Sequence, residues 1–298
     1  MVDPDPDPVT AASPPTTLVH RWSLTPDGMP WRGFMSSVWP VRGPEGQAWA
    51  VKMLDTHHTP AGEGAALETW AGDAWCASRV VRLIDRVNDI ADIPEALLLE
   101  RLDAGRPLQD HPDIDAADAE IAGALAPLGA VEAPAGVRHT TVELERIAGA
   151  IREHWAEAPV LPVRAVSAAL ATLDAMTEDP TVAADRLLCH GDLHYNNVLR
   201  DLDDTRWVVI DPIPSAGVRE IEVIAPLRNR WEDTVASGDP DRFLARRLDR
   251  LSEAAGLHRT RARALAQAVA VDNLLWLLPR DPDSMFVPPY SVLAGWVD

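Results

Sequence analysis

One polar loop holds the residues best suited to chemistry. Residues 189–199 read CHGDLHYNNVL, so that Asn197 follows Asp192 by five positions, and Asp211 comes soon afterwards, behind the apolar run WVVI. This spacing is typical of sites that transfer a phosphoryl group from a nucleotide. Asp192 would accept the proton of a substrate hydroxyl. Asn197 and Asp211 would offer the hard oxygen ligands that Mg²⁺ prefers.

The same loop allows two other interpretations. Asp192 and Asn197 could simply cap a turn. Alternatively, His190, Asp192 and His194 would point to one side of an extended strand and could bind a metal for hydrolysis, although no companion histidine cluster in the sequence supports this. His190 is better explained as a structural hydrogen-bonding residue than as a general base. His194 could contact a substrate or pack, and the sequence leaves both open.

A lysine and a glutamate upstream form a second candidate pair. Lys52 lies near the end of an expected strand, and Glu63 begins an expected helix. A strand lysine paired with a helix glutamate positions the nucleotide phosphates in kinases. Of the 27 Lys and Arg residues, Lys52 alone is a lysine, which indicates that this position needs a compact ammonium group. Glu68, on the same helix, is an alternative partner, and a surface ion pair is an alternative role.

A short loop between expected strands could cover the phosphates of the nucleotide. Residues 32–37 read RGFMSS and contain Gly33, Ser36 and Ser37. The position suits a phosphate-covering loop, but a single glycine is a weak motif that on its own indicates only a turn.

A hinge is expected where an apolar strand meets a glycine. Residues 95–105 read EALLLERLDAG. Backbone groups of Glu100 and Leu102 could hydrogen-bond the base of ATP or GTP there, or the segment could be an ordinary strand end. The sequence does not choose between ATP and GTP, because this selection uses backbone geometry.

Hydrophobic periodicity divides the chain near residues 102–107 into a β-rich part and a helical part. The first predicts strands at 18–24, 36–42, 47–54, 80–87 and 95–102, with a helix at 63–71. The second predicts helices at 115–130, 141–156 and 163–178, short strands at 186–189 and 207–211, and helices again from 220 to 278. We therefore expect an α+β protein with a disordered leader at 1–16, a nucleotide-binding lobe at 17–102 and a larger helical lobe at 103–298.

The composition excludes several classes of protein. A net charge of −19 leaves no basic face for nucleic acid, and it is compatible with a cationic substrate. The sequence has no run of eighteen apolar residues, so no membrane-spanning helix is expected. The acidic, proline-rich N-terminus lacks the features of an export signal, so we expect a cytoplasmic protein. Cys76 and Cys189 form neither a disulfide framework nor a metal-binding spacing.

These segments together resemble a known family. LLCHGDLHYNNVLR, WVVIDP and EVIAPLRNRW are similar to the aminoglycoside phosphotransferase superfamily, and within it to the streptomycin and hydroxyurea phosphotransferases. AVKML, EGAALETWAG, VVRLID and LLLERLDAGRPL resemble the first lobe of that group in order and spacing, so the similarity runs from about residue 18 to about residue 278. The resemblance implies a protein-kinase-like fold with two lobes, ATP or GTP as donor, Mg²⁺ as cofactor, and an O-phosphorylation that inactivates an antibiotic.

The resemblance also implies roles for individual residues. Carried over by position, Asp192 is the catalytic base, Asn197 and Asp211 are the metal ligands, and Lys52 with Glu63 is the pair that positions the phosphates. A nucleotide-binding pseudokinase is disfavoured, because it would be expected to have lost the base or a metal ligand.

The acceptor site is less well defined. Family members carry a pattern close to Gly-Asp-Pro-x-Tyr-Asp/Glu, whereas residues 217–222 read GVREIE, where the acidic residue after the glycine and the aromatic residue are missing and Glu222 remains. Asp272 and Trp276 lie four residues apart in the apolar helix AVAVDNLLWLLP, and on one face they would suit a guanidinium or ammonium group. Alternatively, Trp276 is core and Asp272 pairs with an arginine. Glu220 and Asp233 are further acidic candidates.

The expected function is phosphorylation of a streptomycin-like or related cationic antibiotic. Two alternatives remain open: a kinase of a hydroxylated metabolite in an antibiotic biosynthetic pathway, and a hydroxyurea kinase. The partners expected in each case are a small molecule and a nucleoside triphosphate.

Overall fold

The computed structural model describes residues 13–33, 36–54, 62–88 and 95–297. Contacts between residues divide the chain into two compact units. The first contains Met1–Gly64 and Val81–Arg101, and the second contains Ala65–Val80 and Leu102–Asp298. Residues 65–80 thus belong with the second unit, whereas the sequence analysis assigned them to the first lobe. Residues 1–12 of the expected leader lie outside the described residues, and Thr16 already begins a helix.

The first unit is built on an antiparallel sheet in the order β1-β3-β4-β6-β5, with β2 paired to β3. Its core gathers apolar side chains from α1 and from the sheet, among them Leu18, Trp22, Val51 and Leu98. The strands are β1 (Thr25–Pro26), β2 (Trp31–Arg32), β3 (Ser36–Arg42), β4 (Ala48–Leu54), β5 (Leu83–Val87) and β6 (Ala96–Glu100). The expected strands at 36–42, 47–54, 80–87 and 95–102 are confirmed in their central residues.

The expected strand at residues 18–24 is wrong. Residues Thr16–Arg21 form the helix α1, and the strand β1 begins only at Thr25. Leu18, Trp22 and Leu24 alternate with other residues as a strand requires, but Leu18 and Trp22 are also four apart and lie on one face of a helix. Because all three side chains are buried in the core of this unit, tertiary packing selects the helix.

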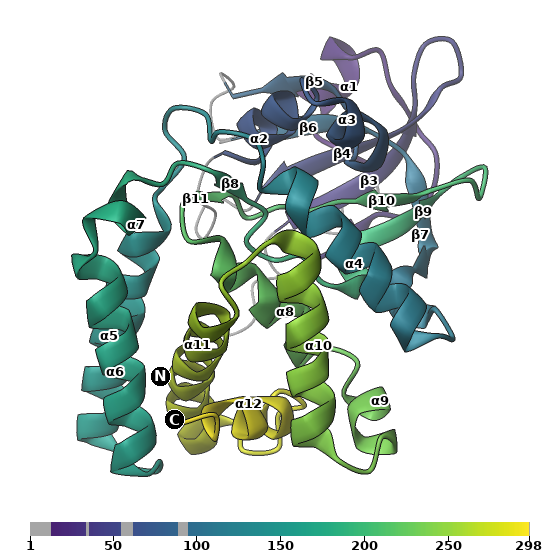
Figure 1. The fold of residues 1–298 in the computed structure, drawn as a ribbon. Helices are drawn as coiled ribbons and strands as arrows, with labels where there is room; N and C mark the ends of the chain where they lie inside the picture. The colour runs from purple at the N-terminus through teal and green to yellow at the C-terminus, as the bar shows by residue number, and fades with distance from the viewer. Residues whose placement is uncertain (1–12, 34–35, 55–61, 89–94, 298) are drawn as a thin grey trace. The chain divides into compact units, whose positions relative to one another are not determined.

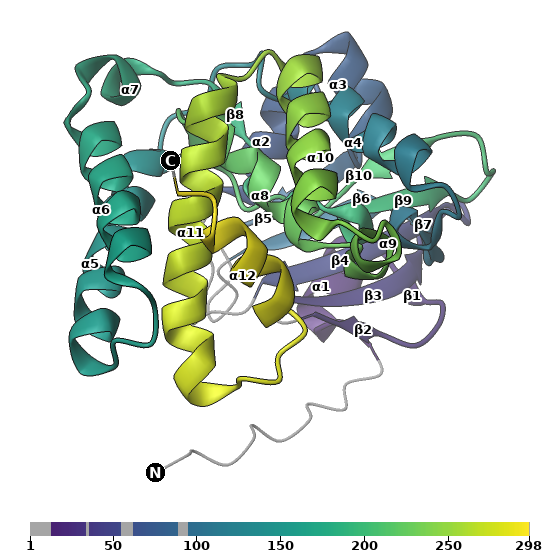
Figure 2. The same ribbon diagram turned by 60° about the horizontal axis from the view of Figure 1, so that its bottom comes forward.

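The second unit is largely helical. α5 (Thr140–Glu157) and α6 (Val163–Glu178) lie side by side and pack against α11 (Arg259–Arg280) (Figure 1). α10 (Pro240–Ala255) packs on α4 (Ile114–Leu128), and α12 (Val287–Ala294) packs on α11 (Figure 2). The shorter helices are α3 (Ala74–Arg79), α7 (Pro180–Ala184), α8 (Ile224–Arg228) and α9 (Trp231–Ala236), and α2 (Glu63–Trp70) crosses the boundary between the units.

The sequence predicted α2, α4, α5 and α6 within two residues at each end. It did not predict α3, α7 or α12. No helix among the described residues has the length and apolarity needed to cross a membrane.

Two small sheets of the second unit hold the polar loop of residues 190–197. β8 (Leu188–Cys189) precedes the loop and pairs with β11 (Ser215–Ala216). β9 (Val198–Asp201) follows the loop and pairs with β10 (Trp207–Val209) and β7 (Leu102–Pro107). Because β8 and β9 are each paired within a sheet, backbone hydrogen bonds anchor both ends of the loop.

Candidate active site

The proposed catalytic loop, residues 190–197 (hereafter the catalytic loop), begins with a close contact between two backbone segments. Gly191 has φ +82°, and a Cβ atom at this position would lie 2.0 Å from the carbonyl oxygen of Ile213. The N–H of Ile213 donates to the carbonyl of His190 at 2.8 Å. Glycine is therefore required here both by its backbone conformation and by the lack of space.

His190 is a buried structural residue, as the sequence indicated. It has no exposed surface, its Nε2 lies 3.0 Å from the carbonyl of Ile210, and its Nδ1 accepts the N–H of Asp192. These partners assign the proton to Nε2 of a neutral ring. Burial lowers the pKa of His190 to about 4, in agreement with that state. A general base or metal ligand is not expected in this position.

Asp192 carries the carboxylate that is best placed to act as a base. Its Oδ1 accepts a hydrogen bond from Nη2 of Arg228 at 2.7 Å, and its Oδ2 lies 3.4 Å from Nε2 of His194. Burial alone would raise the pKa of Asp192, but the hydrogen bond with His194 and the charges of His194 and Arg228 hold it below its usual value. The carboxylate therefore stays ionised at neutral pH. His194, left open by the sequence, contacts this carboxylate.

Asn197 and Asp211 are brought together by the strands that follow and precede them. Val198 pairs with Val209, and the N–H of Ile210 donates to the carbonyl of Asn197 at 2.9 Å. The amide nitrogen of Asn197 donates to the carbonyl of Asp192 at 2.9 Å, so its amide oxygen is the remaining polar atom. Asp211 has φ +59°, an uncommon conformation for a residue with a side chain that is often found at functional sites.

The ligands offered by Asn197 and Asp211 suit a Mg²⁺ ion that is also bound by water and phosphate. They do not suit a metal held by protein ligands alone. One amide oxygen and one carboxylate are the kind of partial site that Mg²⁺ completes with water and phosphate oxygens. Among the described residues, no group of three or more His, Cys, Asp or Glu side chains could hold a metal ion. The alternative in which His190, Asp192 and His194 bind a hydrolytic metal therefore has no geometric support.

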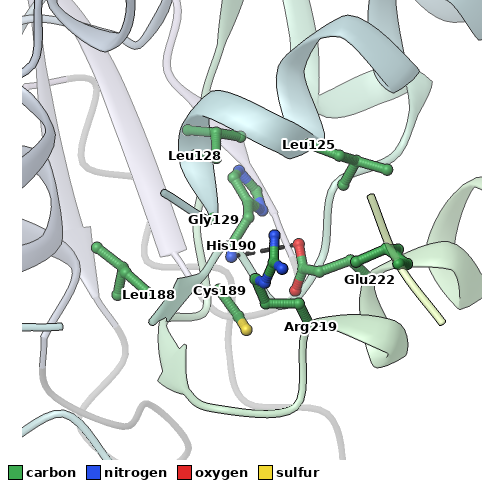
Figure 3. A pocket seen from close by; sticks show the side chains of 9 residues that line it. Leu125, Leu128, Gly129, Leu188, Cys189, His190, Arg219 and Glu222 are labelled. Carbon is green, nitrogen blue, oxygen red and sulfur yellow. Dashed lines mark hydrogen bonds between the residues drawn. The ribbon is translucent and has the colours of Figure 1, made fainter. Parts of the chain in front are cut away.

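Glu222 supports the catalytic loop from inside the fold. Its carboxylate accepts the N–H of Gly191 at 2.8 Å. It also accepts the N–H of His190 at 3.2 Å (Figure 3). Only 7% of its surface is exposed, and burial raises its pKa to about 7. A residue in this position holds the backbone of the loop, so the sequence-based suggestion that Glu222 contacts the acceptor is not supported by its geometry.

A small cavity lies beside this contact. Its lining includes Leu125, Leu128, Cys189, Arg219 and Glu222 (Figure 3). The volume of about 10 Å³ is room for no more than one water molecule. It is too small for a nucleotide or an antibiotic, so it is not a substrate pocket.

Lys52 and Glu63 meet in the first unit as the sequence predicted. Nζ of Lys52, on the central strand β4, lies 2.5 Å from Oε2 of Glu63, the first residue of α2. Only 4% of Lys52 and 2% of Glu63 is exposed, so this is no surface ion pair. Glu95 adds a second buried carboxylate close by. Burial raises the pKa of Glu95, while Arg86 and a hydrogen bond from the N–H of Gly64 oppose the shift.

The loop of residues 32–37 joins β2 to β3. The N–H of Gly33 donates to the carbonyl of Ser36 at 2.9 Å, and Ser37 pairs with Arg32. Phe34 and Met35 lie outside the described residues. The described residues on either side of these two thus pair as antiparallel strands, which is compatible with the expected phosphate-covering loop.

The structure narrows the expected contacts of the nucleotide base. The N–H of Glu100 donates to the carbonyl of Arg82 at 2.9 Å, so this N–H is not the group that contacts a base. Leu102 begins β7 in the second unit and pairs with Asp201 of β9. The strand end at Glu100 is confirmed, and its role as a hinge stays a prediction.

Asp272 and Trp276 lie in α11 but differ in exposure. Trp276 is 49% exposed and is therefore no core residue, and Arg280 lies over its ring at 5.5 Å. The side chain of Asp272 is only 13% exposed, 3.9 Å from Nη2 of Arg146 on α5. Burial raises the pKa of Asp272 to about 6, although Arg146 opposes the shift. Asp272 thus has the arginine partner of the alternative interpretation.

A buried polar cluster beneath the loop was missed by the sequence analysis. Arg247 of α10 contacts both carboxylate oxygens of Asp118 and the hydroxyl of Tyr195, and it is 1% exposed. Asp118 accepts a hydrogen bond from the same hydroxyl. The signal was present in the sequence, because Arg247 occupies an apolar-face position between Leu244 and Leu251. A charge at such a position indicates a buried partner.

Comparisons of sequence give two kinds of match. The model of a family described as aminoglycoside/hydroxyurea antibiotic resistance kinases matches residues 21–279. The streptomycin 6-kinase of Streptomyces glaucescens is 37% identical over 268 residues, which cover 87% of this chain and 80% of that protein. The hydroxyurea phosphotransferase of Kitasatospora aureofaciens is 35% identical over 262 residues, which cover 87% of this chain and 71% of that protein.

Solved structures share the fold at low sequence identity. A ternary complex of a thermostable mutant of the aminoglycoside phosphotransferase APH(4)-Ia with ADP and hygromycin B has a TM-score of 0.59 and 18% identity, covering 95% of this chain and 97% of that chain. The spectinomycin phosphotransferase APH(9)-Ia, bound to ADP and spectinomycin, has a TM-score of 0.56 and 11% identity, covering 95% and 94%. With the sheet-rich first unit and the helical second unit, these likenesses confirm the predicted α+β, protein-kinase-like fold.

Proposed function

Because the chain belongs to the aminoglycoside/hydroxyurea antibiotic resistance kinase family, we propose that it transfers the terminal phosphoryl group of ATP or GTP to a hydroxyl of an antibiotic. The single observation that carries this proposal is the geometry of the catalytic loop. The carboxylate of Asp192 is ionised and accepts a hydrogen bond from Arg228, and the amide of Asn197 donates to the carbonyl of Asp192. Asp211 lies two residues beyond the end of β10, the strand that pairs with the one following Asn197.

Asp192 is the general base in this proposal. It accepts the proton of the acceptor hydroxyl as the oxygen attacks the terminal phosphorus. Its low pKa keeps it ionised and ready to accept that proton. Asn197 and Asp211 would hold Mg²⁺, which when bound neutralises charge on the phosphates.

Lys52 would contact the phosphates of the nucleotide, with Glu63 fixing its ammonium group. Glu95 receives the N–H of Gly64 and so helps to set the start of α2, where Glu63 lies. A Cβ atom on Gly64 would lie 2.7 Å from Oε1 of Glu95, so a larger residue here would displace the Glu95 side chain. The buried pair is thereby held by the sheet on one side and by the helix start on the other.

Two acceptors follow from the relatives: streptomycin or a similar cationic aminoglycoside, and hydroxyurea. We propose His194 as an acceptor contact, since it lies beside the carboxylate oxygen that would receive the proton. Trp276 presents half of its surface to solvent and could stack on a cationic group, with Asp272 adding negative charge nearby.

The first experiment combines a resistance panel with one substitution. Expression in a sensitive host should protect it against at least one aminoglycoside or against hydroxyurea, and the purified protein should phosphorylate that compound. Asp192→Ala should lower kcat by about 10²–10⁴ with little change in nucleotide affinity, because only the general base is lost. Near wild-type turnover of the variant would contradict the role of the loop.

A further inference from the structure

Arg228 makes a contact that the family resemblance did not assign. It is the last residue of α8, and its Nη2 donates to Oδ1 of Asp192 at 2.7 Å. Its Nη1 donates to the hydroxyl of Tyr290 on α12 at 3.3 Å, and the ring of Phe286 lies 5.7 Å from its Cζ. The guanidinium group is thus held by two aromatic side chains, at the start of α12 and within it, while it contacts the candidate base.

The burial of this pair distinguishes it from an ordinary surface ion pair. The side chains of Arg228 and Asp192 are 26% and 23% exposed. Nε of Arg228 is buried and has no hydrogen-bond partner among the described residues. Placing an arginine there costs desolvation that a surface position would avoid. Such a cost is typical of residues kept for orientation rather than for stability.

The end of α8 is itself fixed to the catalytic loop. Arg247 donates to the carbonyls of Pro226 and Asn229, which flank Arg228, and it also contacts the hydroxyl of Tyr195 within the loop. The backbone that carries Arg228 and the backbone that carries Asp192 therefore share one buried anchor. Their relative position does not depend on the Arg228–Asp192 contact alone.

The two oxygens of Asp192 are not equivalent in this arrangement. Oδ1 accepts a hydrogen bond from Arg228 at 2.7 Å, whereas the one partner of Oδ2 found among the described residues is His194 at 3.4 Å, a longer and weaker contact. The other titratable groups around the carboxylate are His190 of the same loop and Glu222 beneath it. Oδ2 is therefore the atom that an acceptor hydroxyl can reach.

We propose that Arg228 is the positioning residue of the general base: it holds Oδ1 of Asp192 so that Oδ2 faces the acceptor hydroxyl. This inference rests on the proposed function. As the acceptor oxygen bonds to the terminal phosphorus, the bridging bond from phosphorus to the nucleoside diphosphate breaks, and the hydroxyl proton passes to Oδ2. Correct orientation of one carboxylate oxygen is worth a large rate factor in such a step.

A double-mutant cycle on kcat tests the proposal. Arg228→Met should lower kcat by about ten- to a hundredfold and change the KM of the nucleotide by less than about twofold, because orientation of the base is lost while nucleotide contacts remain. In an Asp192→Asn background the same substitution should cost less than about twofold, since the group that Arg228 positions no longer acts. Arg228→Lys should recover part of kcat, because the charge returns but the planar fork does not.

The matched control is Arg250→Met, which removes an exposed arginine that pairs with Asp115 and should leave kcat unchanged. Additive losses of Arg228→Met and Asp192→Asn would overturn the proposal. So would a large rise in nucleotide KM at constant kcat, which would make Arg228 a phosphate ligand.

A wild-type protein that phosphorylates no acceptor would refute the proposed function and leave the positioning testable. Crystal structures of the wild type and of Arg228→Met would then compare the Asp192 side chain directly. The proposal requires the carboxylate to leave its single orientation in the variant. An unchanged orientation would overturn it.

Discussion

Two carboxylates at the catalytic loop are driven towards opposite charge states by their surroundings. Asp192 has a basic partner and a partly exposed carboxylate, and its pKa lies below the usual value. Glu222 is buried, with 7% of its surface exposed, and burial raises its pKa to about 7. Such a separation agrees with the proposed roles, in which Asp192 is the base and Glu222 supports the loop backbone. At the scale of single residues, the division of labour is therefore set by burial and not by residue type.

The same reasoning applies to the single lysine of the chain. Lys52→Arg replaces a compact ammonium with a larger planar group in a site where only 4% of the residue is exposed. The guanidinium should not fit against Glu63 and the phosphates together. We expect the KM of the nucleotide to rise, or kcat to fall, by about tenfold or more, which corresponds to about 1.4 kcal/mol.

Steady-state kinetics with varied nucleotide would measure this effect. Arg42→Lys is a suitable control, because Arg42 lies on the neighbouring strand with an exposed side chain and pairs with Asp27. Unchanged kinetics in Lys52→Arg would show that the lysine is incidental to the reaction.

The residues of the candidate site and the Lys52–Glu63 pair could be predicted from sequence, but the contacts that hold Asp192 could not. The spacing of Asp192, Asn197 and Asp211 reflects chemistry that needs those types in that order. The sequence did not predict the contact between Arg228 and Asp192, because nothing in the spacing of two residues 36 positions apart reveals it. Glu222 was misplaced for the same reason: an acidic residue gives no sign in the sequence of whether it is buried.

At the scale of elements, one buried arginine on α10 connects that helix to three segments that are distant in sequence. Arg247 of α10 binds Asp118 of α4, the hydroxyl of Tyr195 in the catalytic loop, and the end of α8. Each partner satisfies part of the donor capacity of the guanidinium. The catalytic loop is therefore positioned by side chains from helices as well as by the two small sheets.

Arg247→Met should consequently affect both stability and catalysis. Removing one partner of a buried pair leaves the charge of Asp118 uncompensated, which costs about 3–5 kcal/mol. For a protein of this size the melting temperature should fall by more than about 5 °C. In the fraction that stays folded, kcat should fall as well, because the loop and α8 lose their common anchor.

Thermal unfolding and kinetics below the transition would separate the two effects. Arg250→Met changes an exposed arginine in the same helix and should shift the melting temperature by less than about 1 °C. A melting temperature of Arg247→Met equal to that of Arg250→Met would show that the buried pair contributes nothing.

Long elements with a clear hydrophobic periodicity could be predicted, and short elements could not. α5 and α6 have many apolar positions on one face, which outweigh any local ambiguity. Residues 18–24 fit both a strand and a helix, and only their packing against the sheet decides. β9 was missed, since its four residues carry no alternation strong enough to indicate a strand.

At the scale of the whole molecule, the family match confirms the resemblance drawn from the motifs. The match does not name the acceptor, and streptomycin and hydroxyurea differ greatly in charge. The net charge of −19 offers a way to separate them. A strongly negative protein raises the local concentration of cations and speeds their association. Streptomycin carries guanidinium groups and is attracted, whereas hydroxyurea is neutral.

Salt should therefore weaken the reaction with a cationic acceptor and spare the reaction with a neutral one. The Debye length shortens from about 30 Å at 0.01 M salt to about 10 Å at 0.1 M, so attraction by distant carboxylates is lost over this range. At saturating nucleotide, we expect kcat/KM for streptomycin to fall by about fivefold or more between these salt concentrations, and kcat/KM for hydroxyurea to change by less than about twofold.

Asp272→Asn then separates local attraction from the attraction of the whole protein. If Asp272 contacts the acceptor, its loss should raise the KM of streptomycin at both salt concentrations. If Asp272 only faces Arg146, the KM should stay unchanged. Equal salt dependence for the two acceptors would show that the charge of the protein does not select its substrate.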